Sequence, residues 1–586
     1  MQSCVDVEPA SLDSRRGFTG QYRWILRQAE QLSGGPIAWN DICSAECIAR
    51  LLARKGFTCN EEVENFLRPR LKSLSDPFLL PQMEAAVSRI LSAIEHRQRI
   101  VLFGDYDVDG VTSLAILSDL LRAFGNPPEL FLPLRMEEGY GLSRESVDRC
   151  LDSYRPQLLI AIDCGTSSVS EIAHLTNAGV DVIVLDHHEP KTALPGCVAV
   201  VNPKIDPNCK FDYLCSAGVV FKVCHGLLKR RPLANYDLRS VLDLVALATV
   251  ADIVPLTGEN RVFVQRGSME LAQTKRLGLR KLLQAAAVRA PIGTEDIGFR
   301  IGPRLNAAGR LSTAEKALQL LLTRDDDEAL LLAGFLDQQN RERQEVEKQT
   351  LLAAEEQIQR EYDWPRDAAI VVSGRGWHPG VVGIVASRIA RKYHRPTIVI
   401  GIDQNGAGKG SGRSILGLHL VRALERCAIH LEKFGGHEMA AGLSIHERNL
   451  PAFVEAFRAI VRELLSDDQL EPQLHLDHEL ALTELNLELL RWHEMLQPFG
   501  NANPQPLFFA REVTPVTPPR VMGDKHLRLH LQQGDARRRA IFFDGATQQL
   551  PTPPWDIAFR IRPDDYDGQR LVEIQIQALR TASLKS

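Results

Sequence analysis

From residue 100 to about 255 the sequence alternates short, continuous apolar runs with longer segments of helical periodicity, and this pattern limits the fold more than any other. The runs span residues 100–103, 129–132, 158–162, 181–185 and 198–201, with helical patterns such as 111–124 and 167–179 between them. Strands that are apolar on both faces and separated by helices are typical of a parallel sheet covered on both sides. The pattern predicts an α/β domain whose ligands bind beyond the carboxyl ends of the strands.

Carboxylates and imidazoles follow three of these strands, and a further carboxylate ends the apolar helix 242–250. In chain order they are Asp105, Asp107, Asp109, Asp163, Asp186, His187, His188 and Asp252. Taken singly, Asp163 could cap a helix, Asp252 could end one, and the histidines could be satisfied core residues. Because four such positions converge on one edge of the sheet, a binuclear site for hard divalent cations, Mg²⁺ or Mn²⁺, is the stronger interpretation.

The composition narrows the class of protein. With 586 residues the chain is expected to form three or four domains, at about 150 residues each. A net charge of -5 gives no global signature of nucleic-acid binding, so an anionic substrate must meet local basic grooves. The eleven cysteines include no CxxC pair, which favours reduced thiols in a cytosolic protein. The N-terminus has no apolar leader and no run of 18 uncharged apolar residues occurs, so we expect neither secretion nor a membrane span.

The remaining regions suggest further units. Residues 1–44 are polar and predicted to be a lightly structured leader, 45–66 and 79–100 show helical spacing, and 325–360 reads as a long exposed helix. A second α/β unit begins near residue 367, with strands at 368–372 and 397–400. Its glycine-rich stretches 408–414 and 434–442 are expected to be loops in which backbone, Ser, Arg and His bind an anion.

The last 115 residues or so contain about six short alternating strands separated by Pro, Gly and Asp. Basic side chains are interleaved with them, and these are Lys525, His526, Arg528, His530, Arg537, Arg538, Arg539, Arg560 and Arg562. This pattern favours an OB-like barrel that binds single strands, the alternative being a small β-domain used only for packing. The predicted domains are 1–44 (leader), 45–324 (α/β with N-terminal helices), 325–365 (connecting helix), 366–470 (second α/β) and 471–586 (barrel).

Four ordered motifs carry a resemblance to a known family. They are Asp105-x-Asp107-x-Asp109-Gly110, Asp163-Cys164-Gly165, Asp186-His187-His188 and Ala248-Thr249-Val250-Ala251-Asp252. Together they resemble the DHH phosphoesterase superfamily, and within it the RecJ exonuclease family most closely. The stretches 301–311, 434–442 and 498–504 resemble that family too, so the likeness covers residues from about 45 to the end. It implies a DHH domain, a DHHA1 substrate-binding domain and an OB-like domain.

The resemblance implies roles for the site residues. The metal ligands would be Asp107, Asp109, Asp163, His187 and Asp252, with Asp163 bridging two ions. The catalytic set would be Asp105, Asp163, Asp186 and His188. Asp105 would ligate a metal or orient its water, and Asp186 and His188 would fix the ligand imidazole and meet the phosphate.

The substrate contacts are implied in the same way. Ser411 and Arg413, with Arg135, would hold a 5′-terminal phosphate, while Arg304, Asn306, Arg310 and His437 would contact phosphates near the cleavage point. An alternative for Arg304 and Arg310 is that they only pair with surface acids.

The activity implied is that of a single-stranded-DNA-specific exonuclease that degrades 5′ to 3′ by two-metal hydrolysis and releases 5′-mononucleotides in recombination and repair. The partners implied are single-stranded DNA, a single-strand-binding protein and a RecQ-type helicase, for a monomer in the cytoplasm that uses Mn²⁺ or Mg²⁺. Two alternatives stay open. One is an oligonucleotide or cyclic-dinucleotide phosphodiesterase, and the other is a non-catalytic DNA-binding scaffold.

Overall fold

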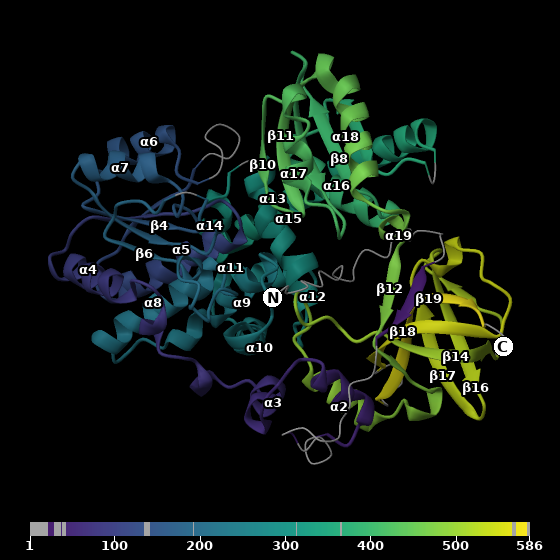
Figure 1. The fold of residues 1–586 in the computed structure, drawn as a ribbon. Helices are drawn as coiled ribbons and strands as arrows, with labels where there is room; N and C mark the ends of the chain where they lie inside the picture. Colours follow the sequence, from purple (N-terminus) through teal and green to yellow (C-terminus); the bar gives the residue numbers. More distant parts are fainter. Residues whose placement is uncertain are drawn as a thin grey trace. The chain divides into compact units, whose positions relative to one another are not determined.

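The computed structural model describes residues 22–27, 37, 43–133, 141–191, 193–311, 313–363, 366–564 and 570–582. These fall into two compact units (Figure 1). The first unit contains Glu64–Arg341 and Leu496–Pro504. The second contains Glu342–Met495, the described residues up to Val63 and those from Gln505 onward.

The first unit is built on a five-stranded parallel sheet. Its strands are β2 (Ile100–Phe103), β3 (Glu129–Phe131), β4 (Leu158–Ile162), β5 (Asp181–Leu185) and β6 (Ala199–Val201), in the order β3-β2-β4-β5-β6. The predicted parallel α/β fold is confirmed, and each strand lies within one residue of its predicted bounds. The carboxyl ends of β2, β4 and β5 consequently meet at one edge of the sheet.

Helices cover both faces of this sheet (Figure 1). One face bears α4 (Met83–Glu95), α5 (Val108–Ala123), α8 (Ser216–Arg230) and α9 (Leu242–Ala251), and the other bears α6 (Arg144–Tyr154) and α7 (Val169–Asn177). Successive residues of β2 point to opposite faces, so Ile100 packs with the first group and Val101 with the second. This explains why the strands are continuously apolar.

Helices complete the first unit after α9. They are α10 (Gly258–Ala272), α11 (Leu277–Ala285), α12 (Thr294–Asp296), α13 (Gly302–Leu311) and α14 (Glu315–Leu322). The stretch 301–311, whose glycines could suggest a turn, is helical. Pro303 lies in its first turn, where the missing amide costs no helical bond, and a Cβ on Gly309 would come within 2.9 Å of the Tyr106 carbonyl oxygen. That glycine therefore serves close packing.

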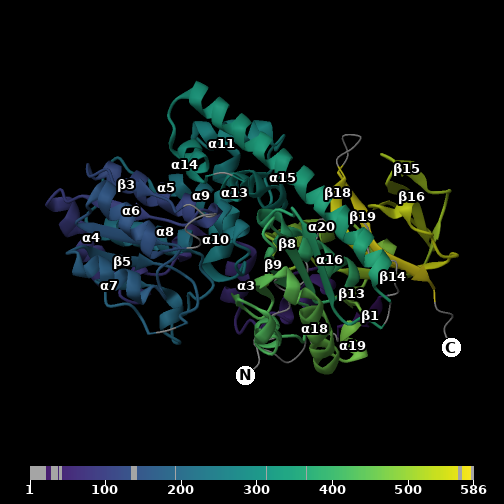
Figure 2. The same ribbon diagram turned by 90° about the horizontal axis from the view of Figure 1, so that it is seen from above.

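The predicted long helix is present as α15 (Asp326–Glu361), which begins in the first unit and ends in the second (Figure 2). No helix in the described part of the chain is both long and apolar enough to cross a membrane.

The second unit contains a five-stranded mixed sheet in the order β10-β11-β9-β8-β7. Its strands are β7 (Ile370–Arg375), β8 (Thr397–Ile402), β9 (Ala407–Arg413), β10 (Lys433–Gly436) and β11 (Ala440–His446), and its helices are α16 (Pro379–Tyr393), α17 (Leu420–Glu425) and α18 (Leu450–Leu464). The glycine-rich stretches predicted as loops are therefore mostly strands. The glycines of β9 make room for neighbours, since a Cβ on Gly410 would lie 2.9 Å from both Ile400 and Leu443.

The C-terminal strands close into a five-stranded barrel of the OB type. The barrel order is β14 (Phe508–Pro515), β18 (Trp555–Asp564), β19 (Leu571–Thr581), β17 (Ala536–Phe542) and β16 (His526–Gln533), and β14 pairs with β16 to close it. Two short strands, β13 (His478–Glu479) and β15 (Arg520–Met522), extend it, and α19 (Asp467–Leu470) and α20 (Leu487–Met495) precede β14 along the chain. The barrel prediction is confirmed, with Arg537, Arg538 and Arg539 inside β17.

Part of the predicted leader is ordered. Strand β1 (Arg23–Leu26) pairs in parallel with β12 (Gln473–Leu476) in the second unit. The buried Asp477 accepts bonds from Arg27, from Arg54 just after α2 (Glu46–Ala53), and from the amide of Leu507. The helical spacing predicted over 45–66 is divided between α2 and α3 (Asn60–Leu67). A lightly structured leader is therefore the wrong description of residues 23–26.

Candidate active site

The acidic stretch after β2 folds into a tight turn that opens α5. Asp107 caps this helix, because its Oδ1 accepts bonds from the amides of Asp109 at 2.9 Å and Gly110 at 3.1 Å. A Cβ on Gly110 would lie 2.3 Å from the carbonyl oxygen of Asp105, so only glycine fits there. Asp105 and Asp109 are almost fully buried, which places two carboxylates inside the protein at the end of one strand.

The amino end of α8 holds Asp109. The amides of Ser216 and Ala217 donate to its two carboxylate oxygens at 2.7 and 2.8 Å. Burial and the charge of Asp107 raise the pKa of Asp109 to about 6, although these amides lower it. The Asp109 carboxylate is thus oriented by backbone N–H donors, but these donors do not neutralise its charge.

Asp163 follows β4 with a φ of 64°, in the left-handed region that residues other than glycine seldom adopt. Such conformations cost roughly 1–3 kcal/mol and occur preferentially at functional sites. Its Oδ1 accepts a bond of 2.8 Å from the hydroxyl of Ser216. Burial first, and then the charges of neighbouring aspartates, raise the pKa of Asp163 well above its ordinary value.

The Asp186-His187-His188 turn after β5 is fixed by its own first residue. Asp186 Oδ1 accepts from the amide of His187 at 2.8 Å and pairs with Nδ1 of His188 at 2.7 Å, and its Oδ2 accepts from the amide of Thr166 at 3.1 Å. Burial opposes ionisation of Asp186, but the His188 interaction outweighs it, so the pKa of Asp186 is lowered. Asp186 is therefore an ionised support that orients His188.

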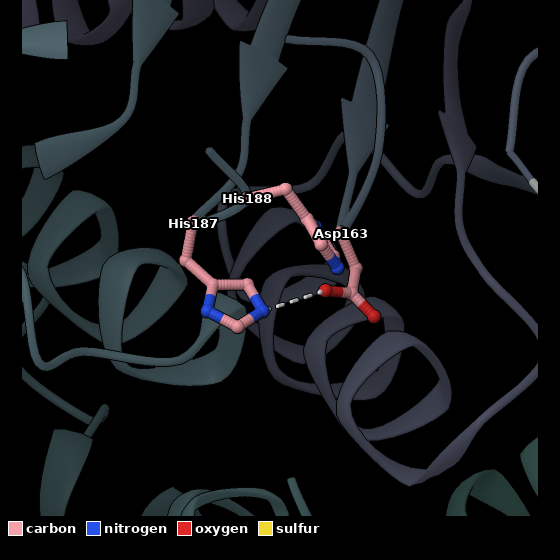
Figure 3. Close-up of side chains that lie close together, drawn as sticks. All are labelled: Asp163, His187 and His188. Carbon is pink, nitrogen blue, oxygen red and sulfur yellow. Dashed lines mark ion pairs between the residues drawn. The ribbon is translucent and has the colours of Figure 1, made fainter. Parts of the chain in front are cut away.

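His187 points toward three carboxylates. Its Nε2 lies 3.4 Å from Asp252 Oδ2, 3.6 Å from Asp163 Oδ1 and 3.8 Å from Asp109 Oδ2. Figure 3 shows the contact with Asp163 and the neighbouring His188 ring. Among the residues that the structure describes, none forms a hydrogen bond with this Nε2 atom. Burial lowers the pKa of His187 to about 3, so its imidazole is neutral.

These residues fit a pair of divalent cations. Their donor atoms form three groups, each within 4.8 Å, which are Asp163-His187-His188, Asp109-His187-Asp252 and Asp105-Asp107-Asp163. Carboxylate oxygens and neutral imidazole suit Mn²⁺ and Mg²⁺. Burial, with repulsion from Asp109, also raises the pKa of Asp252 well above its ordinary value, so the cluster needs counter-charge. A neutral His187 with a buried nitrogen aimed at the carboxylates is the donor that a metal would use.

The structure brings all eight predicted carboxylates and imidazoles together at one edge of the sheet, and adds residues that the sequence did not suggest. Ser216 is one. Asn202 is another, since its side-chain amide donates to Thr166 Oγ1 and to the His188 carbonyl, each at 2.9 Å. Ser216 lies 53 residues after Asp163 in a segment without a motif, and only the fold reveals it. Asn202 directly follows β6, so the argument from the carboxyl ends of strands could have found it.

The predicted phosphate contacts of α13 have protein partners. Arg304 donates through Nε to Asp337 at 2.9 Å and through Nη1 to the Arg300 carbonyl, which favours the alternative of a structural pair. Asn306 Oδ1 accepts from the amide of Val108, tying α13 to the acidic turn. Arg310 lies in α13, but its side chain and the whole of Arg135 lie outside the described residues.

Ser411 and Arg413 form a second polar site on β9, within the second unit. Arg413 Nη1 donates to Ser411 Oγ at 3.0 Å and to the Gly412 carbonyl at 2.8 Å. Burial lowers the pKa of Arg413, and no carboxylate in the described part of the chain pairs with it. A Cβ on Gly383 of α16 would come within 3.1 Å of Ser411 Oγ. A half-buried guanidinium without an acid partner suits an anion. His437 is exposed between β10 and β11.

The barrel carries a basic hollow. It is lined by Val516, Thr517, His530, Arg537, Arg538 and Arg539. His530 and Arg539 lie opposite each other on β16 and β17, while Arg539 also pairs with Asp564.

Comparison with known proteins agrees with this architecture. The chain matches the DHH family, N-terminal domain, over residues 99–249, the DHHA1 domain over 367–463 and the RecJ OB domain over 476–578.

Two relatives are described as single-stranded-DNA-specific exonuclease RecJ. The Bacillus subtilis protein is 38% identical, and the match covers 83% of this chain and 61% of that protein. The Dickeya dadantii protein is 36% identical, over 91% of this chain and 95% of that protein. Two crystal structures of Thermus thermophilus RecJ are also similar. For the complex with Mn²⁺ the TM-score is 0.81 at 31% sequence identity, and the match covers 96% of this chain and 80% of the Thermus chain. For the complex with Mg²⁺ the TM-score is 0.75 at 29% identity, and the match covers 96% of this chain and 79% of the Thermus chain. The chain therefore belongs to the RecJ family of DHH proteins.

Proposed function

We propose that this chain is a single-stranded-DNA-specific exonuclease that uses two divalent cations, Mn²⁺ or Mg²⁺. One observation carries the proposal: the buried His187 nitrogen lies within 3.4–3.8 Å of three carboxylates, in a cluster whose donors fit such ions. Relatives described as single-stranded-DNA-specific exonuclease RecJ support the choice of single-stranded DNA as the substrate.

Two cations in such a site activate water, neutralise charge on the phosphate and stabilise the leaving oxygen. Asp107, Asp109, Asp163, His187 and Asp252 would hold them. Asp163 would be the shared ligand, because it alone belongs both to the group with His187 and to the group with Asp105 and Asp107. Ser216 fixes Asp163 in that position.

The other catalytic residues orient the reacting groups. Asp186 accepts a hydrogen bond from Nδ1–H of His188, which leaves Nε2 of that ring to face the scissile phosphate. Asp105 would orient the attacking water or contact an ion directly. The positions of Asp186 and His188 do not depend on a substrate, because hydrogen bonds within their own turn already hold them.

The direction of cleavage is proposed to be 5′ to 3′, with release of 5′-mononucleotides. Ser411 and Arg413, with Arg135, bind the 5′-terminal phosphate, because a half-buried guanidinium that lacks an acid partner among the described residues suits a dianion. Asn306, Arg310 and His437 complete the proposed phosphate contacts. Arg304 would join them only by giving up its pairing with Asp337.

The cellular setting is part of the same proposal. We place the protein in the cytoplasm as a monomer that acts in recombination and repair with a single-strand-binding protein and a RecQ-type helicase. Free thiols throughout the described cysteines support a reducing compartment. The division into domains at 1–44, 45–324, 325–365, 366–470 and 471–586 is proposed with it.

Digestion of end-labelled DNA tests the proposal. Single strands with a 5′ phosphate should be degraded to mononucleotides from that end only when Mg²⁺ or Mn²⁺ is present, and duplex should resist. Asp163→Ala should abolish release, whereas Asp152→Ala, an exposed aspartate of α6, should not. A preference for dinucleotides would indicate a phosphodiesterase. Metal-independent binding without release, equal in wild type and Asp163→Ala, would indicate a scaffold.

A further inference from the structure

Residues 496–504, which we call the return segment, belong to the first unit although the chain on both sides of them belongs to the second. The segment contains the stretch Pro498 to Pro504 that the proposed function leaves without a role. It must therefore be held on the first unit by contacts of its own.

Arg261 of α10 supplies the main anchor. Its guanidinium is buried and donates to the carbonyl oxygens of Leu496 at 3.2 Å, Gln497 at 2.9 Å and Pro498 at 3.4 Å. The same group stacks on the Phe66 ring, 3.6 Å from its centre. Thr294 adds a bond from its hydroxyl to the Phe499 carbonyl. The first half of the return segment is thus fixed through its backbone carbonyl groups.

The second half of the return segment, at Gly500 and Asn501, binds the loop that follows Asp252. Asn501 Nδ2 donates to the Ile253 carbonyl at 2.7 Å, and the Asn501 carbonyl accepts from the amide of Leu256 at 2.8 Å. A Cβ on Gly500 would lie 2.7 Å from Cδ1 of Leu256, so the backbone of Gly500 packs against the Leu256 side chain. Two bonds and one tight contact therefore connect the return segment to residues 253–256.

Ile253 needs such support. It is a β-branched residue with a φ of 58°, a conformation that costs roughly 1–3 kcal/mol and persists only where the surroundings enforce it. Its side chain is 65% exposed, so packing does not hold it. The hydrogen bond that its amide N–H donates to the Val250 carbonyl is long, at 3.3 Å. The hydrogen bond from Asn501 to the Ile253 carbonyl is therefore a principal restraint on the backbone at this residue.

We infer that Asn501 is a positioning residue for Asp252, acting through the Ile253 carbonyl. Asp252 ends α9, and its Oδ2 lies 3.4 Å from His187 Nε2. A change in the peptide between Ile253 and Val254, which Asn501 holds, alters the backbone torsions of Ile253. Through the preceding peptide this change moves the Asp252 carboxylate relative to His187. The return segment thereby connects the chain that leads into the barrel to the metal site. The inference rests on the proposed function in that it takes Asp252 as a metal ligand.

The test uses full-length Asn501→Ala, which removes the bond to Ile253 but keeps the backbone bond to Leu256. We expect Mn²⁺ affinity, measured by calorimetry, to fall about fivefold, the effect of losing one ordinary hydrogen bond. The kcat on single-stranded DNA should fall by a similar factor, while KM and DNA affinity in EDTA stay within twofold. The isosteric Asn501→Asp should lower Mn²⁺ affinity at least as much, because it sets a carboxylate against the Ile253 carbonyl.

Asn449→Ala is the matched control, since Asn449 also donates a side-chain bond to a backbone carbonyl, that of His430, in the second unit. It should leave Mn²⁺ affinity unchanged. Mn²⁺ affinity and kcat within twofold of wild type in both Asn501 variants would overturn the inference, as would an equal loss in Asn449→Ala. Failure of the wild-type protein to bind Mn²⁺ would overturn the proposed function and the inference with it.

Discussion

The hydroxyl of Ser216 donates to Asp163 at 2.8 Å while the amide of the same residue donates to Asp109 at 2.7 Å. One residue in the first turn of α8 therefore sets the separation of two carboxylates that come from different strands. The amino end of a helix also favours negative charge. The site thus has built-in donors for carboxylates that would otherwise repel each other.

Replacing Ser216 by alanine should weaken the site without unfolding it. The amide bond to Asp109 remains, but Asp163 loses a hydrogen bond to an ionised group, worth roughly 1.5–3 kcal/mol. We expect kcat to fall by at least about tenfold, with weaker Mn²⁺ binding and unchanged DNA affinity in EDTA. Steady-state kinetics and calorimetry measure these quantities.

Ser240→Ala is the control for this substitution. Its hydroxyl donates to the Asp237 carbonyl at an exposed position of the same unit. It should leave kcat and metal affinity unchanged. Wild-type kcat in Ser216→Ala would show that Asp163 needs no hydroxyl to hold it.

Replacing Asp163 by asparagine should abolish activity without lowering the stability of the metal-free protein. In the absence of divalent cations the buried carboxylates repel, so Asp163→Asn should unfold at a temperature equal to or higher than that of wild type in EDTA. Addition of Mn²⁺ should raise the unfolding temperature of wild type by mass action but hardly affect the variant, which should also be inactive. A variant that is destabilised in EDTA would argue that the carboxylate has a purely structural role.

Arg413 should determine the preference for a phosphorylated 5′ end. Arg413→Ala removes a half-buried cation that pairs with no described acid, so the ratio of rates on 5′-phosphate and 5′-hydroxyl strands should fall by about tenfold or more. Arg426→Ala, whose side chain is exposed and paired with Glu463, should leave this ratio unchanged. Labelled strands with either end measure it, and an unaltered ratio would remove Arg413 from the proposed phosphate site.

The sequence predicted the first sheet and the acidic cluster well because both follow from local pattern. Continuous apolar runs define buried parallel strands, and the carboxyl ends of such strands must meet at one edge. The positions of Asp105, Asp163 and His187 relative to one another therefore required no knowledge of long-range packing.

Other features of the fold and of the site could not be predicted from local sequence patterns. The glycines of β9 resemble a loop, and only the neighbouring Ile400 and Leu443 show that they make room for side chains. The bonds of Ser216 to Asp163 and of Asn501 to Ile253 join residues 53 and 248 positions apart. Contacts of this kind depend on the tertiary fold, and no periodicity in the sequence encodes them.

Acid should destabilise the second unit through His493 of α20. Burial lowers the pKa of His493 to about 3 from its ordinary value of 6.5. Below pH 6.5 the unfolded chain therefore binds a proton that the folded protein does not bind until the pH approaches 3. The free energy of unfolding should thus fall as the pH falls through this window, by at most about 1.4 kcal/mol per pH unit from this group.

Urea unfolding between pH 7 and pH 4 measures this effect by comparison of variants. His493→Gln is polar but does not titrate, so its unfolding free energy should depend less on pH than that of wild type, and the difference should grow steadily from pH 6.5 downward. His96→Gln, at an exposed position, should follow the wild-type curve. Parallel curves for wild type and His493→Gln would mean that the folded protein accepts a proton at His493 as readily as the unfolded chain, which its burial should prevent.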